Sequence, residues 1–336
     1  MGMKPSPFAT KIPYEEKNNK VIGGRPNPDD RSDAIDKVTG RARYAADYNL
    51  PGQLIGKVLR SPHAHAVIKS IDTTEAEKIA GVKAVVTRDD FPDMEVEHAA
   101  SGELMVNFRD VTRNMIAREK ALYDGHPVAA VAALSESIAK QALKLIKVDY
   151  EVLPHVIDVV EAMQPDAPLL HEDMFTKGAG IEPDPSKKSN IATRMENKLG
   201  DIEDGFRKAD FIVEHESNTK PTHQGYIEQQ ASIANYSEGG TIEVFTSTQG
   251  HHVFRAQIAK LLKMDLSMIK VVPAELGGGF GGKNNVYLEP LAAQLSRKAN
   301  RPVKMVMTRD EVFRATGPTS GTNCKVKIGC TNDGRI

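Results

Sequence analysis

The sequence contains no tryptophan, and only 5% of its 336 residues are aromatic. Proteins that bind single-stranded nucleic acid use aromatic side chains as stacking platforms, so this composition argues against such a surface. The 44 basic and 45 acidic residues nearly cancel, leaving a formal net charge of −1. Because no strong field of either sign results, neither nucleic acid nor an anionic membrane is favoured as a partner.

Long apolar runs and cysteines are also scarce. No stretch of about 18 apolar residues is present, so no transmembrane helix is expected. The N-terminus lacks the apolar centre of a secretory signal, and the sequence therefore predicts a cytoplasmic protein. The only cysteines are Cys324 and Cys330, whereas an iron–sulfur cluster needs about four thiolates. If the protein transfers electrons, the relay must lie on another chain.

The chain does contain alternating strand-like and helix-like segments, which predict an α/β (α+β) fold. Its length is sufficient for two domains with separate cores. We expect a polar leader over residues 1–30, a first domain over 31–160, a linker over 161–190 and a second domain over 191–336. The linker is rich in glycine, proline and charge, as domain boundaries commonly are.

In the first domain, apolar and β-branched runs predict strands and a 3.6-residue period predicts helices. Strands are expected at 54–61, 66–72, 83–92, 126–134 and 147–154, and helices at 73–81 and 135–146. The run at 126–134 is apolar at nearly every position, which is typical of a strand buried on both faces. In the helix at 135–146, the residues expected to face the core are Ile138, Ala142, Leu145 and Ile146.

The same patterns continue in the second domain. A short helix followed by a strand is expected within residues 200–220. Further strands are expected at 241–248, 269–276 and 303–311, and further helices at 251–265 and 286–302. Residues 324–336 have the pattern of the first arm of a hairpin and end at the turn signal Asn332-Asp333-Gly334. We therefore expect a strand without a partner there.

Residues 277–283 have the sequence GGGFGGK. This spacing fits a dinucleotide fingerprint and most of a phosphate-binding P-loop. A P-loop needs serine or threonine after its lysine to hold magnesium, but Asn284 follows Lys283. A dinucleotide fold needs an acidic residue about 20 positions later and more strands than the remaining residues can form. Two interpretations stay open: a tight connection without a ligand, and a loop at a helix N-terminus whose amides face an anionic group.

Several segments, in order, resemble the molybdenum-binding subunit of the molybdenum hydroxylases, the family of xanthine dehydrogenase, aldehyde oxidase, carbon monoxide dehydrogenase and 4-hydroxybenzoyl-CoA reductase. These segments are DKVTGRARYAADYNLPGQLIGKVLRSPHAHAVIKSID, YDGHPVAAVAA, THQGYIEQQ, TSTQG, GGGFGGK and VKMVMTRDE. The resemblance extends from about Val21 to Ile336. It implies an aldehyde oxidase/xanthine dehydrogenase-type a/b hammerhead domain followed by the first part of a molybdopterin-binding domain.

The resemblance also implies roles for individual residues. Gln249 would hydrogen-bond near the oxygen ligand of molybdenum, with Gly250 beside it. The residues implied to lie against the metal and pterin, where the cofactor leaves no room for Cβ atoms, are Gly278, Gly279, Phe280 and Gly281. Gln249 and Phe280 are therefore the catalytic candidates. No protein side chain is expected to ligate the metal directly, because the pterin holds it.

Two substrate-pocket candidates depart from the family pattern. Asn284 stands where several members that hydroxylate heterocycles carry a glutamate, which argues against a purine substrate of the xanthine type. Glu228 is followed by Gln229, where the family usually has proline. Family subunits are also longer, and their later half carries the glutamate that acts as general base, so this base is not in the chain. We expect one part of a split subunit, or a truncated product, that is inactive without the later half.

The resemblance implies an oxidoreductase that hydroxylates an aldehyde or N-heteroaromatic substrate with water as the oxygen source. The expected cofactor is molybdenum–molybdopterin in the cytosine dinucleotide form. The expected partners are an iron–sulfur subunit with 2Fe–2S centres, an FAD subunit, and a separate chain that supplies the later half of the molybdopterin domain. Two alternatives remain: a P-loop-like nucleotide-binding protein that depends on Lys283, and a non-catalytic remnant of the family.

Overall fold

The computed structural model describes residues 33–101, 104–178 and 182–336. The chain divides into two units, Met1–Arg43 and Tyr44–Ile336. The described part of the first unit holds one short helix, α1 (Ala34–Val38). The leader expected over residues 1–30 lies outside the described residues. No helix in the described ranges is long and apolar enough to cross a bilayer.

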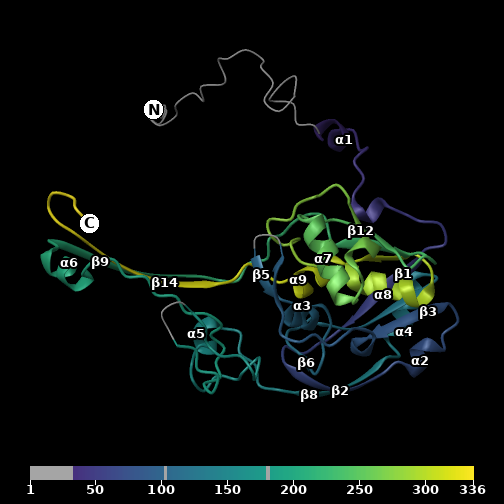
Figure 1. Cartoon of the computed structure of the whole chain (residues 1–336), viewed down its shortest axis with the longest axis horizontal. Helices are drawn as coiled ribbons and strands as arrows, with labels where there is room; N and C mark the ends of the chain where they lie inside the picture. Colours follow the sequence, from purple (N-terminus) through teal and green to yellow (C-terminus); the bar gives the residue numbers. More distant parts are fainter. Residues whose placement is uncertain (1–32, 102–103, 179–181) are drawn as a thin grey trace, which may run out of the picture. The chain divides into compact units, whose positions relative to one another are not determined.

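A seven-stranded mixed sheet is the main element of the second unit (Figure 1). Its strands are β1 (Leu54–Arg60), β3 (Val82–Thr87), β7 (Pro127–Ala133), β10 (Ala231–Tyr236), β11 (Ile242–Thr246), β12 (Ile269–Pro273) and β13 (Val303–Val306). They lie in the order β12-β11-β10-β13-β1-β7-β3. The pairs β1–β13 and β11–β12 are parallel, and the other neighbours are antiparallel. Because β1 pairs with β13, the segments expected as two domains contribute strands to one sheet.

The helices of the second unit are α2 (Thr74–Glu77), α3 (Phe108–Met115), α4 (Glu136–Leu143), α5 (Val159–Ala162), α6 (Ile202–Lys208), α7 (His251–Leu261), α8 (Glu289–Ala299) and α9 (Arg309–Ala315). Five of them, α2, α4, α6, α7 and α8, correspond to helices expected from the sequence, whereas α3, α5 and α9 were not predicted. Short 3₁₀ turns lie at η1 (Ala45–Asp47), η2 (Arg88–Asp90) and η3 (Leu266–Met268). Helix α8 packs against β10, β3 and β13, α7 packs against β12, and α4 packs against β1 and β7.

Strand β7 is buried at every position, as its apolar sequence predicts. Alternate side chains of a strand point to opposite faces. Accordingly, Ala130 and Ala132 belong to the core cluster that includes α7 and α8. Ala129 and Val131 belong to a second cluster with Ala142 of α4. The sheet is therefore covered on both faces at this strand, which explains why no polar residue interrupts it.

Three smaller sheets complete the second unit. The strands β6 (Lys120–Ala121), β2 (Ala66–Asp72) and β8 (Lys147–Val152) form an antiparallel sheet in that order. Strands β4 (His98–Ser101) and β5 (Leu104–Asn107) form a short antiparallel pair. The third sheet consists of β9 (Phe211–Thr219) and β14 (Thr322–Cys330), which run side by side in Figure 1.

The expected unpartnered strand near the C-terminus is a wrong prediction. Strand β14 pairs antiparallel with β9 along its whole length, from Thr322 opposite Thr219 to Cys330 opposite Phe211. The turn signal after β14 suggested a following partner, whereas the partner lies far upstream. Pairing between strands so distant in sequence leaves no local pattern, so a turn signal alone could not reveal it.

Two further predictions fail at element ends. Leu145 lies beyond the end of α4 and is 41% exposed, because the helical period no longer applies there. The strand expected at 303–311 ends at Val306, and α9 begins at Arg309. A capping box starts α9 and so prevents the strand from continuing. The Thr308 hydroxyl accepts from the Glu311 amide (3.2 Å), and the Glu311 carboxylate accepts from the Thr308 amide (2.8 Å).

Candidate functional site

The glycine run at 277–283 connects β12 to α8 and has an unusual backbone. Gly278 and Gly281 have φ angles of 102° and 86°, and Phe280 has a φ of 50°. A left-handed conformation at a bulky residue is rare and is held by its surroundings. Helix α8 begins only at Glu289, so the run does not lead directly into it. The helix start beside the run is that of α7, whose N-cap Gly250 follows Gln249.

Three glycines of the run are needed because the protein's own side chains occupy the adjacent space. A Cβ at Gly277 would lie 2.6 Å from Cβ of Glu228. A Cβ at Gly279 would lie 2.6 Å from Cδ of Gln249, and one at Gly282 would lie 2.6 Å from the Tyr226 ring. At these three positions, side-chain packing is sufficient to exclude a Cβ atom. The resemblance implied exclusion by the cofactor at Gly278, Gly279 and Gly281, so only Gly279 belongs to both sets.

Gln249 is fixed by this run through both its backbone and its side chain. Its amide N–H donates to the Lys283 carbonyl (3.0 Å). Its side-chain Oε1 accepts from the amides of Gly281 (3.0 Å) and Lys283 (3.2 Å). Only the oxygen of the side-chain amide can accept, so these two donors determine its orientation. The Nε2 group is left as a donor with no acceptor among the described residues.

A buried ion pair joins the two ends of the run. The Lys283 ammonium lies 2.6 Å from Oε2 of Glu228, and these side chains are 1% and 10% exposed. The same Oε2 accepts from the Gly277 amide (2.8 Å), while the Glu228 amide donates to the Gly277 carbonyl (3.2 Å). Burial lowers the pKa of Lys283, and the Glu228 carboxylate opposes that shift. Glu228 is therefore an anchor of the loop.

The nucleotide-binding alternative does not agree with this geometry. A P-loop lysine must reach phosphate groups, but Lys283 is directed into the protein and its charge is paired with Glu228. A P-loop also leads directly into a helix, whereas α8 starts six residues after Lys283. The dinucleotide pattern would place the strands on either side of the helix next to each other, but β12 and β13 are separated by β11 and β10.

The remaining sequence-predicted residues lie around the run. Phe280 is 73% exposed, and its ring would be 3.3 Å from a Cβ at Gly278. Asn284 is exposed directly after Lys283. Gly250 is the N-cap of α7, and its amide donates to the Thr248 hydroxyl (2.9 Å). The structure thus brings Gln249, Gly250, Glu228 and the glycine run into one cluster, with Phe280 and Asn284 on its exposed side.

Several supporting residues were missed by the sequence analysis. The buried Tyr226 ring lies 5.0 Å from the Lys283 ammonium, and its hydroxyl contacts Thr316 Oγ1 (3.0 Å). Gln230 donates to that hydroxyl (2.5 Å), and Arg309 donates to the Tyr226 carbonyl (2.8 Å). These partners lie up to 90 positions apart, so no local spacing could have revealed them. The signals in the sequence were the segments THQGYIEQQ, which contains Tyr226 and Gln230, and VKMVMTRDE, which contains Arg309.

Glu289 is a buried acid behind the site, also missed. The Thr246 hydroxyl donates to its Oε1 (2.5 Å), and the Tyr287 amide donates to its Oε2 (2.9 Å). Burial raises the pKa of Glu289 above its ordinary value of 4.5. Because the folded state then binds the proton more tightly than the unfolded chain, this group stabilises the fold below pH 4.5 and loses that contribution as pH rises through the raised pKa.

We therefore predict that Glu289→Gln makes the stability less dependent on pH between 4.5 and neutrality. The new amide oxygen can accept from the Tyr287 amide, and its NH₂ can donate to Thr246, whose hydroxyl also lies 3.2 Å from the Ala231 carbonyl. Urea unfolding at a series of pH values measures the effect. The expected result is a flatter profile and a more stable variant at neutral pH; a steeper fall with rising pH in the variant would contradict the assignment.

The residues of the cluster fit a ligand that has both hydrogen-bond acceptors and donors. Besides Gln249 Nε2, the amides of Gly278, Gly279 and Phe280 have no acceptor within the described part of the chain. Two buried oxygens nearby, Oε1 of Gln224 and Oε1 of Glu228, have no donor among the residues that the structure describes. Buried polar atoms normally have partners, so unpaired ones call for an explanation. A pterin with oxygen-bearing metal and phosphate groups presents both kinds of partner.

Comparison with known proteins gives matches over both halves of the chain. Residues 39–154 match the aldehyde oxidase and xanthine dehydrogenase a/b hammerhead domain family, and residues 183–336 match the molybdopterin cofactor-binding domain family. A probable xanthine dehydrogenase subunit of Bacillus subtilis is 33% identical over 306 residues, covering 91% of this chain and 38% of that protein. The nicotinate dehydrogenase large molybdopterin subunit of Eubacterium barkeri is 30% identical over 304 residues, covering 90% of this chain and 66% of that protein.

A solved structure is also similar to this chain over most of its length. Quinoline 2-oxidoreductase from Pseudomonas putida matches with a TM-score of 0.76 and 26% sequence identity, over 90% of this chain and 37% of that chain. The chain therefore spans 38% of the Bacillus relative and 66% of the Eubacterium relative. The matched family segments meet in the seven-stranded sheet, since β1, β3 and β7 come from the first and β10 to β13 from the second.

Proposed function

The chain belongs to the xanthine dehydrogenase and aldehyde oxidase family as a molybdopterin-binding large subunit, with the hammerhead domain and part of the cofactor-binding domain, and we propose that Gln249 and the glycine run bind its cofactor. The cofactor would lie against Gly278, Gly279, Phe280 and Gly281, and Gly250 would keep Gln249 in place as the start of α7. When bound, the molybdenum group supplies the oxidation of the substrate carbon and the transfer of oxygen from water.

The observation that carries this proposal is the orientation of the Gln249 amide. Two backbone donors hold Oε1, so the NH₂ group is presented as a neutral donor. A neutral donor stabilises an oxygen ligand without changing the charge of the metal group, and a donor held in place needs no reorganisation during the reaction. The free amides of the glycine run supply further donors for oxygen atoms of the cofactor.

The proposed reaction is hydroxylation of an aldehyde or N-heteroaromatic substrate with water as the oxygen source. Relatives named for nicotinate and quinoline support an N-heteroaromatic substrate. Asn284 lies exposed beside the run and is the proposed substrate-facing residue, and its neutral amide disfavours a purine of the xanthine type. Glu228 is committed to Lys283 and Gly277, so we propose that it positions the loop.

We further propose a cytoplasmic complex. Electrons would leave through partner subunits with 2Fe–2S and FAD centres, since the two cysteines of this chain cannot hold such a cluster. The general base would lie in the part of the cofactor domain that residues 1–336 do not include. The cofactor would be the cytosine dinucleotide form.

The reaction can be tested in the complex isolated with its natural partners. Aldehydes, nicotinate and quinoline are offered in isotopically labelled water with an electron acceptor, and the products are analysed by mass spectrometry. We expect one substrate class to gain a hydroxyl oxygen from the labelled water. If the loaded complex oxidises a substrate with no oxygen from water, or converts none of these substrates, the proposed reaction is wrong.

Replacing Gly279 with alanine is expected to lower the molybdenum and pterin content of the purified complex severalfold. The added Cβ overlaps the side chain of Gln249, which must move and lose its fixed orientation. A matched control is Gly239→Ala, because the nearest atom there lies at 3.7 Å and φ is not positive. Cofactor content is measured by elemental analysis and pterin fluorescence. Equal content in both variants would show that the Gln249 orientation is not required for binding.

A further inference from the structure

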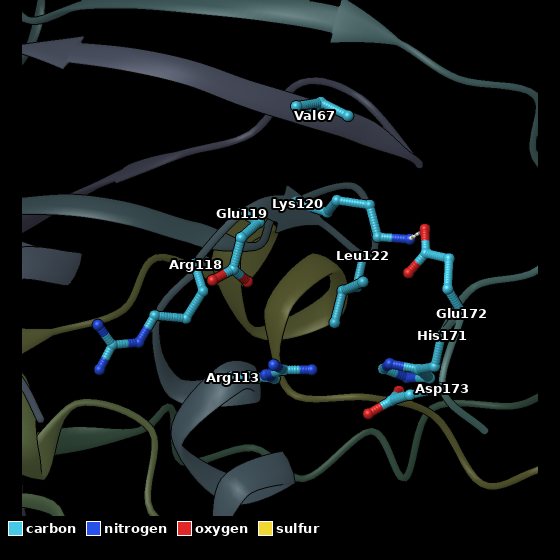
Figure 2. Close-up of a pocket in the computed structure, with 9 residues that line it drawn as sticks. All are labelled: Val67, Arg113, Arg118, Glu119, Lys120, Leu122, His171, Glu172 and Asp173. Atoms are coloured by element: carbon cyan, nitrogen blue, oxygen red, sulfur yellow. Dashed lines mark hydrogen bonds and ion pairs between the residues drawn. The ribbon is translucent and has the colours of Figure 1, made fainter. Parts of the chain in front are cut away.

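A second cluster of polar residues lies away from the glycine run, in a cavity of about 410 Å³. It opens to solvent and is bordered by β2, α3, β6 and the segment after Leu170. Figure 2 shows its lining residues, which are Val67, Arg113, Arg118, Glu119, Lys120, Leu122, His171, Glu172 and Asp173. None of them belongs to the proposed cofactor site, so a role for this cavity is independent of the proposed function.

The negative charges of this cavity are largely paired already. Lys120 bonds to Glu172 at 2.6 Å and also to the Leu170 carbonyl at 2.7 Å. Asp173 forms an ion pair with Arg109 at 2.5 Å, outside the lining. Glu119 is exposed and forms no ion pair with Arg113. The carboxylates of the 171–173 segment therefore serve to attach it to α3 and β6.

Arg113 is the cation of the cavity that lacks a partner. Its Nε atom is buried without an acceptor, and its guanidinium makes no hydrogen bond or ion pair with any described residue. Arg118, by contrast, is 8% exposed and donates to the carbonyls of Arg88 (2.7 Å) and Phe91 (2.8 Å). These hydrogen bonds hold its side chain in place at the side of the cavity. A partly buried guanidinium without an acceptor is unfavourable, and an oxyanion is the partner that it binds best.

His171 lies opposite this guanidinium (Figure 2). Its ring has no hydrogen-bond partner among the described residues. Burial lowers the pKa of His171; Asp110 and Asp173 oppose that shift, and Lys120 and Arg113 reinforce it. The neutral imidazole can donate one hydrogen bond. Arg113 and His171 thus offer unpaired donors from two separate elements to the same space.

We propose that this cavity binds the oxyanion of a small molecule, a phosphate or a carboxylate, between Arg113 and His171. The guanidinium donates two parallel hydrogen bonds to two oxygens, and the imidazole donates to one of them or to a third. Lys120 stays on Glu172 and contributes positive potential at the edge of the site. The cavity is larger than either anionic group alone, which leaves room for an attached organic group.

The experiment is a titration of the full chain with inorganic phosphate in one arm and acetate in the other, followed by the imidazole resonances of His171 and by calorimetry. We expect saturable binding in one arm, with a rise in the pKa of His171 because an anion favours its charged form. Arg113→Gln should weaken that binding at least tenfold, roughly the value of a charge-assisted hydrogen-bond pair. Arg297→Gln is the charge-matched control, since Arg297 is exposed on α8, and it should bind like the wild type.

Two results would overturn the proposal. The first is the absence of a saturable shift of His171 with both anions, which needs only the wild-type chain and so decides even if a variant fails to fold. The second is an equal loss of affinity in Arg113→Gln and Arg297→Gln, which would mean that the anion binds through the overall surface charge and not at this cavity. Saturation by phosphate but not acetate assigns a phosphate ligand, and the reverse assigns a carboxylate.

Discussion

Lys283→Met is expected to lower the free energy of unfolding by about 3–5 kcal/mol, because it removes one partner of a buried ion pair. The Glu228 carboxylate would keep its bond to the Gly277 amide but lose the only charge that compensates it within the described residues. Methionine has a similar length and apolar character, so the loss of charge dominates over a loss of volume. Chemical denaturation followed by circular dichroism measures the change.

Two comparisons make this result specific. Lys260→Met removes an ion pair with Glu97 of the same 2.6 Å length, but its side chains are 46% and 42% exposed. Such a surface pair contributes less than about 1 kcal/mol. The double variant Lys283→Met/Glu228→Gln removes both buried charges and should recover part of the stability. Equal losses in Lys283→Met and Lys260→Met would mean that the buried pair does not anchor the loop.

Gln249→Glu is expected to lower kcat/KM of the assembled enzyme by about a hundred- to a thousandfold, the effect of losing one preorganised donor to a developing charge. One carboxylate oxygen can still accept from the amides of Gly281 and Lys283, so the loop keeps its conformation. The second oxygen replaces the NH₂ donor with a negative charge. Steady-state kinetics and molybdenum content are measured on the same preparation.

The control for this substitution is Gln164→Glu, which introduces the same charge at an exposed glutamine that donates to the Val160 carbonyl. Its activity should equal that of the wild type. If Gln249→Glu retains full activity at normal molybdenum content, Gln249 does not act at the metal group. A non-catalytic member of the family would give no activity in either the wild type or the variant.

Local patterns were sufficient to predict most elements of the second unit. The apolar run of β7 is buried throughout, and the helix expected at 251–265 forms as α7, with Phe254, Ile258 and Leu261 buried. These predictions succeed because the direction of the side chains repeats with a fixed period in each kind of element, so the pattern of apolar residues indicates the element. They fail where the end of an element depends on a particular hydrogen bond, as at Thr308. They also fail where a strand pairs with a distant segment, as β14 does with β9.

The sequence named residues that the structure brings together around the glycine run, but it did not predict how they contact one another. The motifs pointed to Gln249 and the glycine run, yet they carried no sign that Lys283 pairs with a glutamate 55 positions away. The resemblance assigned Gly278, Gly279 and Gly281 to contact with the cofactor. It gave no sign that Gly277, Gly279 and Gly282 are needed for packing against Glu228, Gln249 and Tyr226. Contacts between segments that are distant in the sequence form only in the folded chain, so no local sequence pattern predicts them.

The binding of a molybdenum cofactor to this cluster is decided by the molybdenum and pterin content of the complete complex, purified with its natural partners. Elemental analysis and pterin fluorescence are compared with the amount of this chain. We predict molybdenum and pterin in stoichiometric amounts, strongly reduced in Gly279→Ala and retained in Gly239→Ala. A complete, folded complex that contains neither molybdenum nor pterin would contradict the assignment of this cluster as a cofactor site.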